Sequence, residues 1–213
     1  YQRIRDEILS GRLTPGTPLS VPELARQFSI SRSPVREAVQ RLIYDGLAGG
    51  VPYRGAVVRS VAAADLQHLY HVRELLEGLA ARLAADRIDA VRLNKITKIL
   101  DGHRQVIESG DEARHVELDV AFHRCIRDAS GNPYLNEILE NIQGKAHLAQ
   151  FQLWRGERGP QVAVEEHENI LRALAKGDPD GADAAARAHV ARLRRQLAGA
   201  QETTAGTEQA GSA

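Results

Sequence analysis

The most informative segment of this chain is Ser31-Arg32-Ser33-Pro34-Val35-Arg36-Glu37-Ala38-Val39-Gln40-Arg41-Leu42-Ile43-Tyr44-Asp45-Gly46. Its apolar residues repeat at helical spacing, Ser31 can cap the helix, and Gly46 is a natural stop. Arg32, Ser33 and Arg36 lie at the start of this helix, away from the apolar stripe. Because helix-turn-helix proteins read the major groove with side chains from the first turns of a helix, these three residues are candidate DNA contacts.

The neighbouring segments predict the rest of a small domain. Residues 1–9 carry apolar side chains at helical spacing, and a second short helix precedes the one described above. After that helix come two short β-like runs, Leu47–Gly50 and Ala56–Arg59, which predict a hairpin, or wing. Arg54 and Gly55 lie at its tip, where they can reach phosphates or the minor groove.

These segments resemble a known family. The winged helix-turn-helix of GntR-type bacterial transcription regulators is similar to the motifs Gly11-Arg12-Leu13-Thr14-Pro15-Gly16, Leu24-Ala25, Ile30-Ser31-Arg32-Ser33-Pro34-Val35-Arg36-Glu37-Ala38, Leu42, Asp45-Gly46-Leu47 and Arg54-Gly55-Ala56-Val57. The resemblance implies that Arg32 and Arg36 contact operator bases and phosphates and that Arg54 and Gly55 form the wing tip. Some FadR-type members place a further arginine at the start of the second helix. Residues 20–24 contain none, so the operator sequence cannot be carried over.

The composition is that of a soluble protein. The chain has 213 residues, 43% hydrophobic and 26% charged, which fits one or two globular domains. No apolar run approaches the roughly 18 residues of a membrane span and no signal peptide is visible, so we expect no membrane partner. Cys125 is the only cysteine, which excludes an internal disulfide framework and suits a reducing cytoplasm. The chain contains no Met, so we expect residues to precede Tyr1.

The net charge of zero hides an asymmetry. Residues 1–60 hold nine arginines and five acidic residues, a net charge of +4, and the remainder carries −4. A basic first quarter on an acidic body favours a polyanionic partner for the first part only, although a chance imbalance of surface charge is the alternative.

From Ala63 onward the pattern is helical. Six helices, separated by turns rich in Gly, Ser, Asn and Asp, are predicted over Ala64–Asp86, Asp89–Ser109, Asp111–Ala129, Pro133–Arg155, Pro160–Lys176 and Pro179–Ala198. We therefore predict a mostly α protein, with a winged helix-turn-helix over residues 1–60 and an antiparallel six-helix bundle over residues 61–198. Residues 199–213 are small and polar, which predicts a disordered tail.

The first helix of this body carries a charge within its apolar arc. Arg73 lies about 40° from Leu69 on a helical wheel, on its Leu66 side. An unpaired guanidinium is costly in an apolar interior, so something anionic should meet it. The partner is either an internal acid, such as Glu77 one turn on, or the carboxylate of a bound small acid.

Histidines lie on the apolar faces of three helices. His123 follows Asp119 by four residues and points the same way, and His167 and His189 each lie among apolar residues of their own helices. Each alone is explained by a satisfied core position, but together they compose a nitrogen and oxygen donor set suited to a divalent metal. His115, one turn before Asp119, could replace a ligand or support one. The remaining histidines are predicted to lie at the surface or rim: His68, His71, His103 and His147.

The helical body also resembles a known domain. The effector-binding helical domain of the FadR branch of GntR regulators, in its smaller VanR-like six-helix form, is similar to the motifs Val72-Arg73-Glu74-Leu75-Leu76-Glu77, Asp119-Val120-Ala121-Phe122-His123, Ala129-Ser130-Gly131-Asn132-Pro133, Glu166-His167-Glu168-Asn169-Ile170-Leu171 and Ala188-His189-Val190. In metal-binding members the matching ligands are Asp119, His123, His167 and His189. The resemblance implies a divalent ion, zinc first with nickel or manganese as alternatives, and effector contact by Arg73.

These predictions together favour a ligand-responsive transcription regulator, and a repressor in particular. A homodimer would place two winged heads on an inverted-repeat operator in double-stranded DNA, and a small carboxylic acid beside the metal would change their affinity for it. One alternative is a metal-dependent hydrolase, since such a metal can activate water. Another is an architectural DNA binder in which the metal only fastens the bundle.

Overall fold

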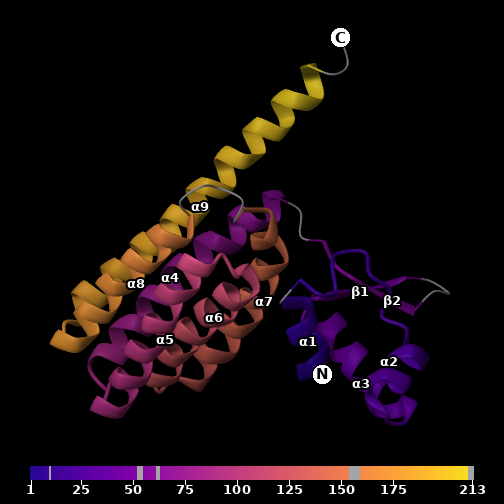
Figure 1. Ribbon diagram of the computed structural model, residues 1–213, viewed down its shortest axis with the longest axis horizontal. Coiled ribbons are helices and arrows are strands. Elements are labelled where there is room, and N and C mark those ends of the chain that lie inside the picture. The colour runs from indigo at the N-terminus through magenta and orange to yellow at the C-terminus, as the bar shows by residue number, and fades with distance from the viewer. Residues whose placement is uncertain (10, 52–54, 61–62, 154–158, 211–213) are drawn as a thin grey trace. The chain divides into compact units, whose positions relative to one another are not determined.

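The computed structural model describes residues 1–9, 11–51, 55–60, 63–153 and 159–210. Within these ranges the chain forms nine helices and one antiparallel hairpin (Figure 1): α1 Gln2–Leu9, α2 Val21–Phe28, α3 Arg32–Tyr44, β1 Ala48–Val51, β2 Gly55–Val58, α4 Ala63–Ala85, α5 Ala90–Ser109, α6 Glu112–Ala129, α7 Pro133–Leu153, α8 Gly159–Lys176 and α9 Pro179–Ala210. The predicted fold class, a winged helix-turn-helix followed by a helical domain, is confirmed.

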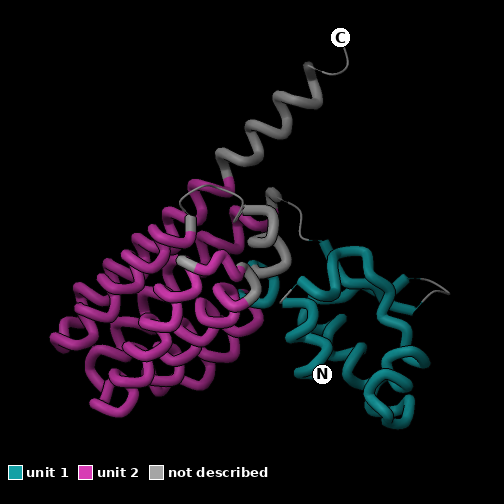
Figure 2. Tube along the Cα trace, in the orientation of Figure 1, with its two compact units in different colours: residues 1–62, 143–151 teal, residues 63–142, 152–213 magenta. Residues whose placement is uncertain are grey.

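The chain divides into two compact units (Figure 2). The first comprises Tyr1–Ala62 together with Gln143–Phe151, and the second comprises Ala63–Ile142 and Gln152–Ala213. The sequence predicts that residues 61–198 form one domain. The structure differs from this prediction because it groups Gln143–Phe151 with the first unit. Glycine at position 144 permits this close packing, because a Cβ there would lie only 3.1 Å from the side chain of Leu47.

The first unit is organised by the apolar face of α3. Val35, Val39 and Leu42 are buried and pack in one core with residues of α1, α2 and the hairpin. Ser29 adopts a left-handed conformation (φ 55°) between α2 and α3, and the backbone N–H of Ile30 donates to the carbonyl of Ala25 at 3.0 Å. This tight turn places the start of α3 directly after α2, and the face of α3 that points away from the core is exposed to solvent.

The hairpin follows α3 directly. Its register pairs Ala48 with Val58 and Val51 with Gly55, and each strand begins one residue away from the predicted run. Gly55 has φ +86°, a conformation that side-chain-bearing residues rarely adopt. Residues 52–54 at the predicted tip, Arg54 among them, lie outside the described residues.

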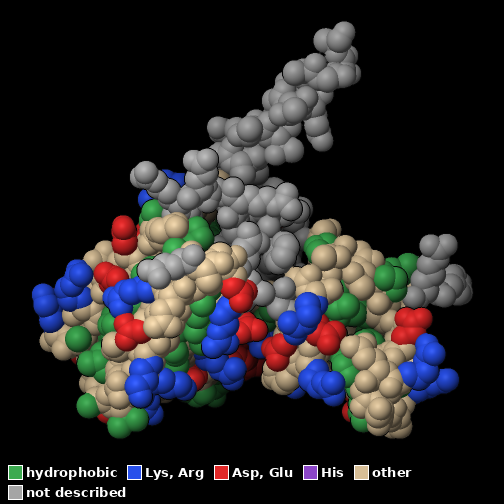
Figure 3. All heavy atoms as spheres, viewed as in Figure 1, with side chains coloured by type: hydrophobic (Ala, Val, Ile, Leu, Met, Phe, Trp, Pro, Cys, Tyr) green, Lys and Arg blue, Asp and Glu red, His purple; other side chains and the backbone are tan. Residues whose placement is uncertain are grey.

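In the second unit, α4 packs against α6, α8 and α9. Small residues permit the approach of α4 and α9: Ala81 and Ala84 of α4 share a core cluster with Ala182 and Ala186 of α9. Basic and acidic side chains are interspersed on the surface of this unit in the view of Figure 3, so its exposed charges are mixed in sign there.

The last helix differs from the prediction. It was expected to end at Ala198 before a disordered tail, but α9 continues to Ala210. The added stretch contains no proline, so nothing in it forces the helix to stop. Residues 211–213 lie outside the described residues. Among the described helices, none is long and apolar enough to cross a membrane.

Candidate metal centre and DNA-reading helix

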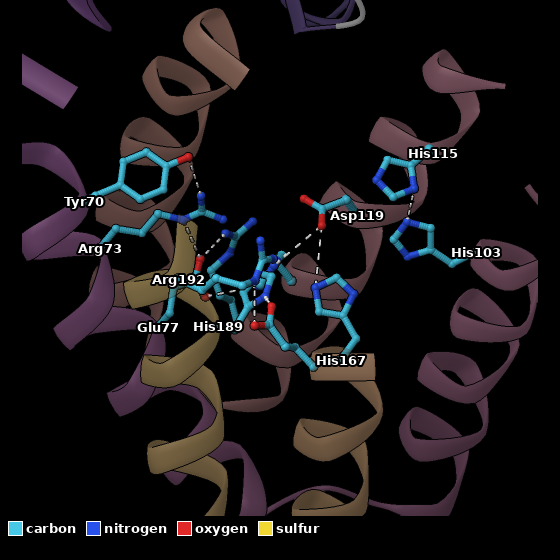
Figure 4. A network of polar contacts seen from close by, with 12 residues as sticks. Tyr70, Arg73, Glu77, His103, His115, Asp119, His167, His189 and Arg192 are labelled. Atoms are coloured by element: carbon cyan, nitrogen blue, oxygen red, sulfur yellow. Dashed lines mark hydrogen bonds and ion pairs between the residues drawn. The ribbon is translucent and has the colours of Figure 1, made fainter. Parts of the chain in front are cut away.

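A layer of buried polar side chains crosses the helical unit (Figure 4). Its members are almost completely shielded from solvent and come from five helices: Arg73 and Glu77 from α4, His103 from α5, His115, Asp119, His123 and Arg127 from α6, His167 from α8, and His189 from α9. Apolar clusters pack in the same unit, so these groups must satisfy one another or a ligand.

Four of these side chains converge. One donor atom from each of Asp119, His123, His167 and His189 lies within 4.8 Å of all the others. Oδ1 of Asp119 is 3.6 Å from Nε2 of His167 and 3.9 Å from Nε2 of His123. Donors bound to one ion at about 2.0–2.2 Å lie about 3–4.4 Å apart, so a small inward shift would complete the coordination. The structure thus brings together all four predicted ligands.

The histidine nitrogens of the cluster are available to a metal ion. Nε2 of His123, His167 and His189, and also Nδ1 of His167, are buried and have no hydrogen-bond partner among the described residues. Burial holds the pKa of His167 well below its ordinary value and lowers that of His189. Neutral imidazole is the form that binds metal, and three imidazoles with one carboxylate suit zinc and neighbouring divalent ions.

Phe122 supports the ring of His167. The two rings stack with centroids 4.1 Å apart and an interplanar angle of 14°. This stacking holds the plane of the imidazole although neither of its nitrogens has a hydrogen-bond partner within the described chain.

Two glutamates lie behind the cluster. Glu166 accepts from Arg192 Nε at 2.6 Å and lies 2.8 Å from Nδ1 of His189. Glu77 lies 3.7 Å from Nδ1 of His123 and accepts from Arg127 at 3.3 Å. Burial alone would raise the pKa of both carboxyl groups, but the neighbouring basic side chains hold them below the ordinary value.

Arg73 is fully buried and only partly satisfied. Its Nε lies 3.5 Å from Glu77 and its Nη1 lies 3.4 Å from the hydroxyl of Tyr70. These are long distances for a charged donor, whose hydrogen bonds are normally about 2.7–2.9 Å. Nη2 is buried and has no hydrogen-bond partner in the described residues. Glu77, the internal acid that the sequence offers as a partner, therefore contacts Arg73. Nη2 remains available to a further acceptor.

His103 corrects one prediction. It was expected at the surface or rim, but its exposed fraction is 0% and its Nε2 lies 2.5 Å from Nδ1 of His115. It shares a helix face with Ile96 and Leu100, both buried, which is the signal that was overlooked. Burial lowers the pKa of His103. Burial also lowers the pKa of His115, to about 4. His115 is not one of the four converging donors.

The other histidines lie apart from this layer. His68 and His71 are exposed, as expected, and the side chain of His147 lies outside the described part of the chain.

The DNA-reading candidates lie on the exposed side of the first unit. Arg32, Ser33 and Arg36 occupy the first turns of α3 and are all exposed to solvent. Gly55 is exposed at the start of β2. The fourth candidate side chain, Arg54, is not described.

Sequence reasoning missed several members of the polar layer. Arg127 follows Asp119 and His123 at the same four-residue spacing, so the pattern already placed it on their face. Tyr70 precedes Arg73 by three residues and is also on its face. Arg192 follows His189 by three residues, but its partner Glu166 lies on another helix, which spacing along one helix cannot show.

A winged helix-turn-helix on an all-helical domain with buried donor side chains is the architecture of a DNA-binding transcription regulator. Residues 1–58 match the family described as bacterial regulatory proteins, gntR family, and residues 68–192 match the FCD domain. The chain belongs to the GntR family and carries an FCD domain.

Known relatives agree with this assignment. The chain is 30% identical to the HTH-type transcriptional regulator YdhC of Bacillus subtilis over 89% of this chain and 85% of that protein. It is 28% identical to the HTH-type transcriptional repressor RspR of Escherichia coli, over 89% and 83%. The fold is similar to that of E. coli McbR/YncC, with a TM-score of 0.85 and 24% identity over 94% and 95% of the two chains.

The family and these relatives point to a regulator and not to an enzyme. The GntR match implies DNA as a partner, and the FCD match implies a small-molecule effector.

Proposed function

We propose that this protein is a repressor whose affinity for operator DNA changes when a small carboxylic acid binds beside a divalent metal ion in the helical unit. The observation that carries the proposal is the convergence of Asp119, His123, His167 and His189 in a chain that also has a winged helix-turn-helix.

DNA recognition is assigned to the start of α3. Exposed guanidinium groups of Arg32 and Arg36 can each donate two hydrogen bonds to a guanine, and Ser33 can donate to a phosphate. Arg54 and Gly55 of the wing would contact phosphates or the minor groove. A dimer would present two such helices to half-sites about 34–36 Å apart on an inverted repeat.

The metal site is assigned to the four converging donors. Zinc is the first choice, and nickel and manganese accept similar nitrogen and oxygen ligands. When bound, the ion would act as a Lewis acid that attracts a carboxylate. Asp119 contributes the negative charge of the set, and the three histidines contribute neutral donors.

Effector binding is assigned to Arg73. Its Nη2 is a buried charged donor without a hydrogen-bond partner among the described residues, and such a group is costly unless something satisfies it. A carboxylate matches the fork of guanidinium donors and can accept two parallel hydrogen bonds from it.

Dimerisation is assigned to exposed apolar side chains on α4 and α7. Val72, Leu75 and Leu79 lie along one side of α4 and are 38–54% exposed; Tyr134 and Ile138 of α7 are 78% and 51% exposed. The two helices pack through Ala80, Leu135 and Leu139, so these groups lie on neighbouring elements. Exposed apolar side chains on two helices that pack together favour a protein partner, and a second copy would cover the same surface on both chains.

Operator binding in the presence of candidate acids tests the proposal. A duplex selected for binding to the full chain would be titrated by fluorescence anisotropy, with zinc and with a panel of small mono-, di- and hydroxycarboxylic acids. A coupling of about 1–3 kcal/mol would change the affinity about 5- to 150-fold. We expect His167→Ala to lose this response and its metal by elemental analysis, and Arg36→Ala to lose operator selectivity.

Two outcomes would contradict the proposal. If no acid changes the operator affinity of the zinc-loaded protein, the proposal that this protein senses a small carboxylic acid is wrong. An architectural role for the metal would then remain. If Arg36→Ala gives the wild-type footprint, the assignment of α3 is wrong. Binding should also weaken steeply with salt, because phosphate contacts release counterions.

A further inference from the structure

Nδ1 of His189 forms a hydrogen bond with a carboxylate. Nδ1 of His189 lies 2.8 Å from Oε2 of Glu166, and this is the hydrogen bond that fixes which ring nitrogen carries the proton. A carboxylate only accepts, so Nδ1 must carry the proton and Nε2 keeps its lone pair. Nε2 is the buried atom without a hydrogen-bond partner in the described chain, so it is the nitrogen that His189 can still offer to the donor cluster.

Glu166 is itself held in place. Its other oxygen, Oε1, accepts from Nε of Arg192 at 2.6 Å, and Nη1 of Arg192 donates to Gln196 at 2.8 Å. Arg192 and Gln196 lie three and seven residues after His189, so they follow it along one side of α9. Glu166, in contrast, comes from α8, so this chain of hydrogen bonds joins two helices.

A similar arrangement lies behind His123. Oε2 of Glu77 is 3.7 Å from Nδ1 of His123, an ion-pair distance longer than a hydrogen bond. Glu77 is 2% exposed and is held by Arg127 and Arg73 through its Oε1. Two of the three cluster histidines therefore have a carboxylate on the side away from the donors, and each carboxylate has an arginine behind it.

We propose that Glu166, fixed by Arg192, is a positioning residue of the metal centre that sets the metal-facing tautomer of His189. This inference rests on the proposed metal site and goes beyond its four ligands. A hydrogen-bonded carboxylate orients the imidazole ring and makes its free nitrogen more basic, and loss of such a partner typically weakens metal affinity about 10- to 100-fold.

A merely structural role for Glu166 predicts something different. The Glu166–Arg192 pair is 19% and 16% exposed, so most of it is buried, and loss of one partner can lower stability whether or not a metal is bound. If that were the only role of Glu166, its neutralisation would lower the stability of the metal-free chain and leave metal affinity unchanged.

Glu166→Gln is the test, with Glu165→Gln as the matched control. Glu165 is the preceding residue on α8 and is exposed, so the control removes the same charge from the same helix. Zinc affinity of the full chain would be measured by competition with a chromophoric chelator, and folding of the metal-free variants by circular dichroism. We expect Glu166→Gln to lower the zinc affinity about 10- to 100-fold and Glu166→Asp to lower it less. The zinc affinity of the Glu165→Gln control should change by no more than about twofold. Equal affinities for Glu166→Gln and Glu165→Gln would overturn the proposal.

A measurement on the unmodified chain keeps the proposal testable if the variant does not fold. Nitrogen-15 NMR of the zinc-loaded protein should show His189 protonated at Nδ1 and coordinated through Nε2. Coordination through Nδ1 would overturn the role of Glu166 while leaving the metal site in place. Failure of the wild-type chain to bind zinc, nickel or manganese would instead refute the metal site itself.

Discussion

His115 makes the acid stability of the metal-free protein predictable. Burial lowers its pKa from the ordinary 6.5 to about 4 in the folded state. As the pH falls below 6.5, the unfolded chain takes up a proton at this position that the folded chain refuses until the pH reaches about 4. The contribution of His115 to the free energy of unfolding is therefore fully present above pH 6.5. It is lost progressively as the pH falls toward 4.

The size of the effect follows from the pKa difference. Each unit is worth about 1.4 kcal/mol, so this histidine accounts for about 3.4 kcal/mol once the pH lies below both values. At pH 5 the unfolded chain is almost fully protonated there and the folded chain only slightly. The loss at pH 5 relative to pH 8 is then about 2 kcal/mol.

His115→Asn removes this proton while an amide remains near the position of Nδ1 to meet His103. Urea unfolding at pH 8, 7, 6 and 5, with a chelator present, should show that the variant loses about 2 kcal/mol less than the wild type between pH 8 and 5. His68→Asn, an exposed position on α4, should follow the wild-type curve. A difference below about 0.5 kcal/mol between His115→Asn and the wild type would refute the reasoning.

Two further predictions concern α4. Glu77→Gln leaves Arg73 buried without its carboxylate, and should lower the free energy of unfolding by about 3–5 kcal/mol in urea titrations. Glu74→Gln, whose pair with another arginine is partly exposed, should cost less than about 1 kcal/mol, and equal losses would mean that the buried charge is compensated elsewhere. Leu75→Glu places a charge on the exposed apolar side of α4 and should convert a dimer to a monomer in sedimentation velocity, and an unchanged dimer would move the interface off this helix.

Helical spacing made much of the donor set predictable. A four-residue separation places Asp119 and His123 on one side of α6, and apolar neighbours place His167 and His189 on buried faces. What spacing cannot say is which helices become neighbours. His103 faces His115 only because α5 packs on α6, and Glu166 meets His189 only because α8 packs on α9. Contacts between helices depend on packing, which a single-helix pattern does not contain.

The buried charges suggest why a metal and an acid would bind together. Among the described residues of the helical unit, the buried charged side chains are Arg73, Glu77, Asp119 and Arg127, which sum to zero. A divalent ion would add two positive charges to an interior that solvates them poorly. A carboxylate placed between the ion and Arg73 would offset part of this cost. Under the proposed function each ligand should therefore raise the affinity for the other by the same factor, because coupling between two binding equilibria is reciprocal.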